Sequence, residues 1–252
     1  MAELLSVRFS KIGHSTARLD GLAYDLTGDD GSPENSMIIA SNATGKTSQL
    51  HLLYSIFLPA KHDLATHLDE DGRSFPYYFQ DNEVGFVVTE WTIPGSNRSL
   101  LGGMEKTRVV GRFTQYSNRD EEKHETYFFS FIADEEVGID DLPLTSSIQV
   151  GRVEKHCRTI SETKKYLNEV FNKPGREFYC KDVIRDWHDN LRKIGFNIDQ
   201  FKMMMKFTLS EGDSSSFLKK FKDNDLILDF LCGEVIDKRS EEHTSELQSR
   251  QS

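Results

Sequence analysis

The residues whose types and spacing most clearly suggest chemistry lie at positions 37–48, in the run Met-Ile-Ile-Ala-Ser-Asn-Ala-Thr-Gly-Lys-Thr-Ser. The apolar residues 37–39 predict a short strand, and the apolar pattern within residues 50–57 predicts a helix that ends before Pro59. A loop of small residues between a strand and a helix is the setting of a phosphate-binding P-loop. The backbone N–H groups of such a loop and the N-terminus of its helix form an anion site.

Two side chains of this run have defined roles in a P-loop. Lys46 would reach the terminal phosphates, and the Thr47 hydroxyl would bind Mg²⁺. The expected cofactors are therefore ATP and Mg²⁺. The predicted nucleotide-binding residues are Ser41, Asn42, Ala43, Thr44, Gly45, Lys46, Thr47 and Ser48.

The match to the pattern G-x-x-x-x-G-K-[ST] is incomplete. Ala40 stands at the first glycine and Ala43 stands in the middle of the loop. Both residues are small, so phosphate can approach the backbone, but neither takes positive φ as freely as glycine. The alternative is an ordinary Gly-Lys-Thr turn before a helix.

Alternating apolar residues predict strands on both sides of this loop. Two strands precede it, and the later ones are joined by polar connections, which favours an antiparallel meander. The expected strands cover residues 4–12, 18–26, 84–93, 100–104, 107–116 and 126–132.

The pattern changes from strand to helix after about residue 150. Ser161 is the expected N-cap of a first helix, and further helices are expected over residues 181–194 and 198–207. Leu228, Leu231 and Val235 have the spacing of a helix seam that could begin a coiled coil. The predicted division is residues 1–150 as a P-loop and antiparallel β lobe, 151–238 as a helical segment leading towards a coiled coil, and 239–252 as a tail.

Charge and cysteine usage narrow the class of protein. The formal net charge is −10, so general nucleic-acid binding is not expected, although basic clusters at residues 152–158 and 219–222 could contact DNA locally. The sequence has no run of about 18 apolar residues, so no membrane span is predicted. No secretory signal is visible, and three cysteines without a C-x-x-C pattern favour reduced thiols, so the expected location is cytoplasmic.

A second candidate motif, an acidic one, follows an apolar run later in the chain. Residues 128–135 form an apolar run that ends in Asp134 and Glu135, as a Walker B motif does: Asp134 would hold Mg²⁺ and Glu135 would polarise water. However, aromatic residues alternate with Ser130, which is typical of a half-exposed antiparallel strand. A Walker B strand is parallel and buried on both faces.

Taken together, the strand pair, the Asn-x-x-Gly-Lys-Thr loop, the meander and the helices ending in Ser-Glu-Gly resemble the N-terminal half-head of SMC/Rad50-like ABC-type ATPases. Asn42 matches the asparagine of the family's P-loop signature, and residues 207–217 look closest to the MukB-like and Wadjet-like bacterial relatives. The resemblance implies an α/β fold, a P-loop NTPase half-head with an antiparallel meander followed by a helical segment.

The same resemblance implies an ATP-binding head fragment of a DNA-engaging ATPase in chromosome organisation, repair or defence against plasmids and phages. Its implied partners are the C-terminal half-head of the same protein, a second copy through the heads, DNA and accessory subunits, with no membrane. The Walker B and signature motifs would lie in that C-terminal half-head. This chain alone is therefore expected to bind nucleotide weakly and not to hydrolyse it.

In that family a glutamine contacts Mg²⁺ and the attacking water after the helical segment. Here Glu211, or else Ser210, occupies the corresponding stretch, and a carboxylate could ligate Mg²⁺. The alternative for Glu211 is a turn that ends a helix. Gln80 is a second candidate, but it precedes the meander.

Residues 239–252 resemble the translation of a sequencing-library adapter, so the natural reading frame is expected to be interrupted near Lys238; the alternative is a genuine polar tail. Two other hypotheses of function remain. One is a complete small P-loop NTPase switch with Walker B at Asp134 and Glu135. The other is a non-enzymatic binding module in which residues 45–47 are incidental.

Overall fold

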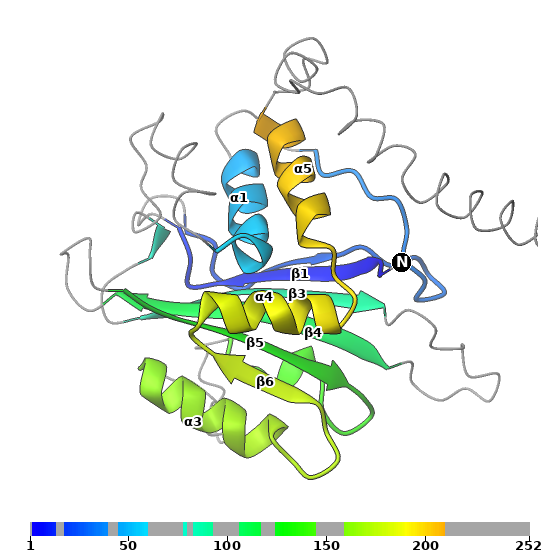
Figure 1. The fold of residues 1–252 in the computed structure, drawn as a ribbon. Coiled ribbons are helices and arrows are strands. Elements are labelled where there is room, and N and C mark those ends of the chain that lie inside the picture. Colours follow the sequence, from blue (N-terminus) through cyan, green and yellow to red (C-terminus); the bar gives the residue numbers. More distant parts are fainter. Residues whose placement is uncertain are drawn as a thin grey trace, which may run out of the picture. The chain divides into compact units, whose positions relative to one another are not determined.

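The fold is known from a computed structural model that describes residues 2–13, 18–39, 45–59, 78–79, 83–92, 106–116, 124–144 and 159–209. The chain divides into two compact units, Met1–Ile198 and Asp199–Ser252. The first unit contains one six-stranded sheet in which every neighbouring pair is antiparallel (Figure 1). In spatial order the strands are β2 (Leu22–Asp25), β1 (Leu4–Ser10), β3 (Val84–Thr92), β4 (Thr107–Tyr116), β5 (His124–Ala133) and β6 (Phe178–Lys181).

Four α-helices occur in the described part of the chain. They are α1 (Lys46–Phe57), α3 (Ile160–Phe171), α4 (Ile184–Lys193) and α5 (Ile198–Leu209), of which all but the first residue of α5 belongs to the second unit. The mixed α/β class and the meander β3-β4-β5 are confirmed. The predicted strand at 100–104 and the expected domain boundary at residue 150 lie outside the described residues.

Helices cover both faces of the sheet, with α1 and α3 on opposite sides in Figure 1. β5 shows how the alternation of its side chains serves both faces. Phe128 stacks on Trp187 of α4, with ring centroids 5.4 Å apart, whereas Phe131 meets Phe171 of α3 at 4.1 Å. The Ser130 hydroxyl, on the α4 side, accepts a hydrogen bond from the Asn190 amide at 3.1 Å.

The expectation of a half-exposed β5 is therefore wrong. Phe128, Phe129, Ser130 and Phe131 are each at most 2% exposed. A serine in an apolar strand suggests a solvated face, but here its hydroxyl is satisfied by α4, a predicted helix whose contact with this strand no local pattern indicates. The antiparallel direction of the strand is confirmed by its pairing with β4 and β6.

Three other local predictions need correction. Residues 37–39 form no strand. Thr159, not Ser161, is the N-cap of α3, because its hydroxyl accepts from the Glu162 N–H while the Glu162 carboxylate accepts from the Thr159 N–H. A helix is predicted to begin at Lys181 and no strand is predicted before it, but residues 178–181 form the edge strand β6.

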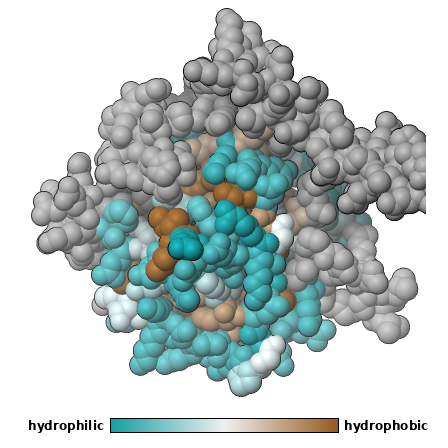
Figure 2. All heavy atoms as spheres, viewed as in Figure 1, coloured by the Kyte–Doolittle hydropathy of each residue, from teal (hydrophilic) through white to brown (hydrophobic). Residues whose placement is uncertain are grey.

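Most of the described large apolar side chains of the first unit are buried, and the described part of the face in Figure 2 is largely hydrophilic with separate hydrophobic patches. The exposed exceptions fall into two groups in the sequence. Val183 and Ile184 lie at the start of α4, and Met37, Ile38, Ile39 and Leu50 flank the predicted P-loop. Because exposed apolar side chains that lie together mark interaction or ligand-binding sites, the second group bears on function.

Candidate nucleotide-binding site

The predicted site is centred on the N-terminus of α1, where Gly45 precedes the first helical residue, Lys46. Gly45 has φ 80° and ψ 20°, the left-handed conformation that favours glycine. A Cβ at Gly45 would meet nothing within 4 Å, so the requirement for glycine is conformational and not one of space. A left-handed residue directly before right-handed ones turns successive N–H groups towards one side, as anion-binding loops do.

The side chains of this first turn suit an anion. The turn carries no acidic residue, so the partial positive charge of the helix N-terminus is not neutralised from within the helix. Thr47 is exposed and Lys46 and Ser48 are half-buried. A hydroxyl and an ammonium group at a helix N-terminus are the donors and metal ligand that a Mg²⁺-bound phosphate requires.

Two tyrosines from outside the helix contact the residues that follow. The Tyr24 hydroxyl, from β2, donates to Oε1 of Gln49 at 2.6 Å. The Tyr78 hydroxyl donates to Oγ of Ser48 at 3.0 Å. Both contacts are partly buried, and together they tie the first turn of α1 to two separate segments of the chain.

The C-terminal end of α1 is held in a different way. Its last carbonyls have no partner within the helix. Nη1 of Arg112, from β4, donates to the Ser55 carbonyl at 3.3 Å, and Nε1 of Trp187, from α4, donates to the Ile56 carbonyl at 2.6 Å. α1 is thus fixed at both ends by side chains from other elements, although its own apolar pattern gave no sign of this.

The structure describes half of the predicted site. Gly45, Lys46, Thr47 and Ser48 are brought together in one turn, as the motif predicts. Ser41, Asn42, Ala43 and Thr44 lie outside the described residues, together with the candidates Gln80, Ser210 and Glu211 and the two basic clusters. Their predicted roles stay predictions.

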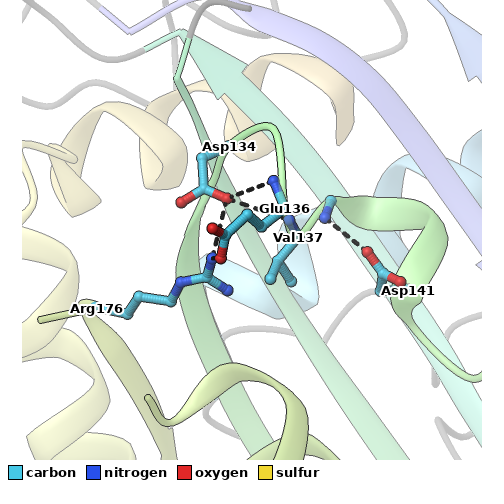
Figure 3. A network of polar contacts seen from close by, with 6 residues as sticks. Asp134, Glu136, Val137, Asp141 and Arg176 are labelled. Carbon is cyan, nitrogen blue, oxygen red and sulfur yellow. Dashed lines mark hydrogen bonds and ion pairs between the residues drawn. The ribbon is translucent and has the colours of Figure 1, made fainter. Parts of the chain in front are cut away.

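Asp134 and Glu135 have a setting that differs from a Walker B motif. Asp134 follows an antiparallel strand, and its Oδ1 accepts from the N–H groups of Glu136 and Val137 at 3.0 and 3.1 Å (Figure 3). Arg176 pairs with Asp134 at 3.3 Å and with Glu136 at 2.6 Å. Asp134 therefore holds a turn, and Glu135 is exposed beside it.

The segment that enters the predicted loop is solvent-exposed. Met37, Ile38 and Ile39 are 82%, 49% and 82% exposed and belong to none of the described strands. A run of three apolar residues is a stable strand only when a neighbouring strand pairs with it and a layer covers it. None of the described strands takes that place in this chain.

The contacts that position α1 were missed by sequence reasoning. Tyr24 belongs to the strand predicted over residues 18–26, and no element is predicted at Tyr78. Arg112 lies within the strand predicted over residues 107–116, yet it is only 3% exposed, and it also donates to the hydroxyls of Thr114 and Thr126. No spacing in the sequence links these residues to α1, because each contact joins segments far apart in the chain.

The described residues include no cluster of three or more His, Cys, Asp or Glu side chains that could hold a metal ion. Within those same residues, no helix combines the length and apolar character needed to cross a membrane. Comparison of the chain with models of protein families and with curated proteins finds no match.

Proposed function

We propose that this chain is the ATP-binding N-terminal half-head of an SMC-like, DNA-engaging ATPase. The observation that carries the proposal is the start of α1: a left-handed Gly45 followed by Lys46 and Thr47 in a first turn without acidic residues. The antiparallel lobe that supports α1 agrees with the half-head architecture that the sequence resembles. The biological setting proposed is chromosome organisation, DNA repair or defence against plasmids and phages.

In this proposal each residue of the first turn has a separate task. The backbone N–H groups of the turn bind phosphate oxygens. The Lys46 ammonium stabilises the charge that develops on the transferred phosphoryl group, and the Thr47 hydroxyl ligates Mg²⁺. The Ser48 hydroxyl offers one more donor to the phosphates.

The proposed partner that completes the site is the C-terminal half-head of the same protein. The exposure of Met37, Ile38 and Ile39 supports this, because a partner strand would bury them and would turn residues 37–39 into the strand that a P-loop normally follows. The catalytic carboxylates would come from that partner. The engagement of Asp134 with its own turn and with Arg176 argues against a complete Walker B site in this chain.

The test is binding of a fluorescent ATP analogue with Mg²⁺ to the full chain and to Lys46→Ala. Removing a charge-assisted hydrogen bond costs about 1.5–3 kcal/mol, so Lys46→Ala should bind at least about tenfold more weakly. Lys165→Ala is the matched control, since Lys165 is a 78% exposed lysine on α3. Binding that Lys46→Ala leaves unchanged would favour the non-enzymatic module instead.

Hydrolysis separates the proposal from its main alternative. The full chain alone should not turn over ATP. ATP hydrolysis that Asp134→Ala abolishes would overturn the half-head proposal in favour of a complete small NTPase. Sequencing the source DNA beyond the codon for Lys238 gives an independent test: heptads followed by a signature motif and a Walker B motif are expected.

A further inference from the structure

We propose that Tyr24 and Tyr78 are positioning residues of the nucleotide site, acting through Gln49 and Ser48. This inference rests on the proposed function. It concerns how the first turn of α1 is held without a capping side chain. Neither tyrosine belongs to the P-loop motif.

The turn cannot be held in the usual way. Most helices fix their N-terminus with a Ser, Thr, Asp or Asn side chain that accepts from the N–H groups of the first turn. Gly45 stands at the N-cap and has no side chain. A capping side chain would also consume the donors that a phosphate needs, so a phosphate-binding helix requires another anchor.

The tyrosines supply an anchor that uses side-chain atoms only. Tyr24 donates to the Gln49 amide oxygen and Tyr78 donates to the Ser48 hydroxyl, so neither contact engages a backbone N–H of the turn. The Ser48 oxygen accepts from Tyr78, so its own proton is directed elsewhere. That geometry prepares Ser48 to donate to an anion.

Each tyrosine is itself held, Tyr24 by strand pairing and Tyr78 by contacts of its backbone and of its neighbour. Tyr24 lies opposite Val7 in the β2–β1 pair. Tyr78 is 7% exposed, and its carbonyl accepts from the Gly13 N–H at 2.7 Å. The ring of the adjacent Phe79 lies so close to Gly85 of β3 that a Cβ there would come within 2.8 Å of it. Tyr78, which donates to Ser48, is therefore itself held in place by the surrounding fold.

The experiment measures affinity for the same fluorescent ATP analogue with Mg²⁺, using the full chain carrying Tyr24→Phe or Tyr78→Phe. Each substitution removes one neutral hydrogen bond, so each should weaken binding about 3-fold to 10-fold. Tyr166→Phe is the matched control: it removes the 2.8 Å hydrogen bond from a tyrosine to the Asp141 carbonyl on the α3 side of the sheet. That variant should bind nucleotide as the wild type does.

A double-mutant cycle distinguishes positioning from general destabilisation. If Tyr78 acts through the Ser48 hydroxyl, Tyr78→Phe should have no further effect on affinity in a Ser48→Ala background. Effects that add in full would overturn the inference for Tyr78, and unchanged affinity of both tyrosine variants would overturn it entirely. If nucleotide binding by the wild type does not depend on Lys46, the proposed function is overturned as well. If it does depend on Lys46 and both tyrosine variants bind as the wild type does, only this inference is overturned.

Discussion

At the residue scale, the conformation of Gly45 decides whether the Gly-Lys-Thr run can do chemistry. With φ 80° the residue turns the chain into α1 so that Lys46 and Thr47 begin the helix. An alanine there would be strained, although space for its Cβ exists. The glycine is thus explained by backbone geometry and not by packing.

Cys180 is a residue whose reactivity follows from its burial. It packs against the core on the α3 side of the sheet. Burial raises the pKa of the Cys180 thiol to about 12, and the nearby Lys164 ammonium opposes this only in part. In a Cys157→Ser, Cys232→Ser variant, the thiol should react with iodoacetamide at pH 8 at least about 100-fold more slowly when folded than in urea.

The raised pKa of the Cys180 thiol predicts how its labelling rate and its contribution to stability change with pH. The labelling rate of the folded protein should rise about tenfold per pH unit up to pH 11, because the thiolate fraction grows until the pH reaches the pKa. A rate that levels off near pH 9 would contradict the shift. Since the folded pKa is raised above its ordinary value of 9.0, the contribution of Cys180 to stability should be lost as pH rises from about 9 to about 12.

At the element scale, α1 depends on contacts at both ends more than on its own pattern. Its N-terminal turn is tied by Tyr24 and Tyr78, and its C-terminal carbonyls accept from Arg112 and Trp187. In its second half, Leu52, Ile56 and Phe57 are each at most 1% exposed, whereas Leu50 in the first half is 41% exposed. The helix that presents the candidate site is therefore docked at several independent points.

Trp187→Phe tests the C-terminal attachment. Phenylalanine keeps the stacking on Phe128 but cannot donate to the Ile56 carbonyl, so the free energy of unfolding should fall by about 1–3 kcal/mol. The measurement is urea unfolding with an unchanged m-value. Hydrogen exchange in the last turn of α1 should also become faster.

The control for this prediction is Asn190→Ala, which removes a hydrogen bond between α4 and β5 without touching α1. It should leave hydrogen exchange in α1 unchanged. Equal acceleration in both variants would mean that α4 docking as a whole, and not the indole hydrogen bond, protects the helix end.

At the scale of the whole molecule, the first of its two units is an antiparallel sheet with helices on both faces. Its two cores differ in composition: Phe57, Trp91 and Phe196 meet on the α1 side, whereas Phe129, Phe131 and Phe171 lie on the α3 side. Aromatic rings therefore contribute to both layers.

The polar tail should contribute nothing to this architecture. Residues 239–252 contain a single large apolar residue, Leu247, so they offer at most about 1.5–3 kcal/mol of apolar burial. Deleting the tail should leave the melting temperature unchanged, while Leu167→Ala, at a position with 0% exposure, should lower it by several degrees. A drop of several degrees on deletion would show that the tail packs on the fold.

How far the sequence predicted the fold depended on whether a signal was local. The bounds of β4 and the end of α1 before Pro59 followed from alternation and from a residue that cannot continue a helix. The strand at residues 37–39 was wrong because apolar character alone does not make a strand without a pairing partner. β6 was missed because four residues beside a turn carry too short a pattern.

The sequence by itself determined the chemistry that the first turn of α1 could perform, because residue types and their spacing specify an ammonium group, a hydroxyl and a glycine in adjacent positions. Only the tertiary structure decided which residues hold that turn and what the other polar residues of the sheet do. Asp134 became part of a turn, Ser130 became buried, and Tyr24 and Tyr78 reached α1. These outcomes depend on contacts between segments far apart in the chain, and periodicity within one segment contains no information about the partner that will cover it.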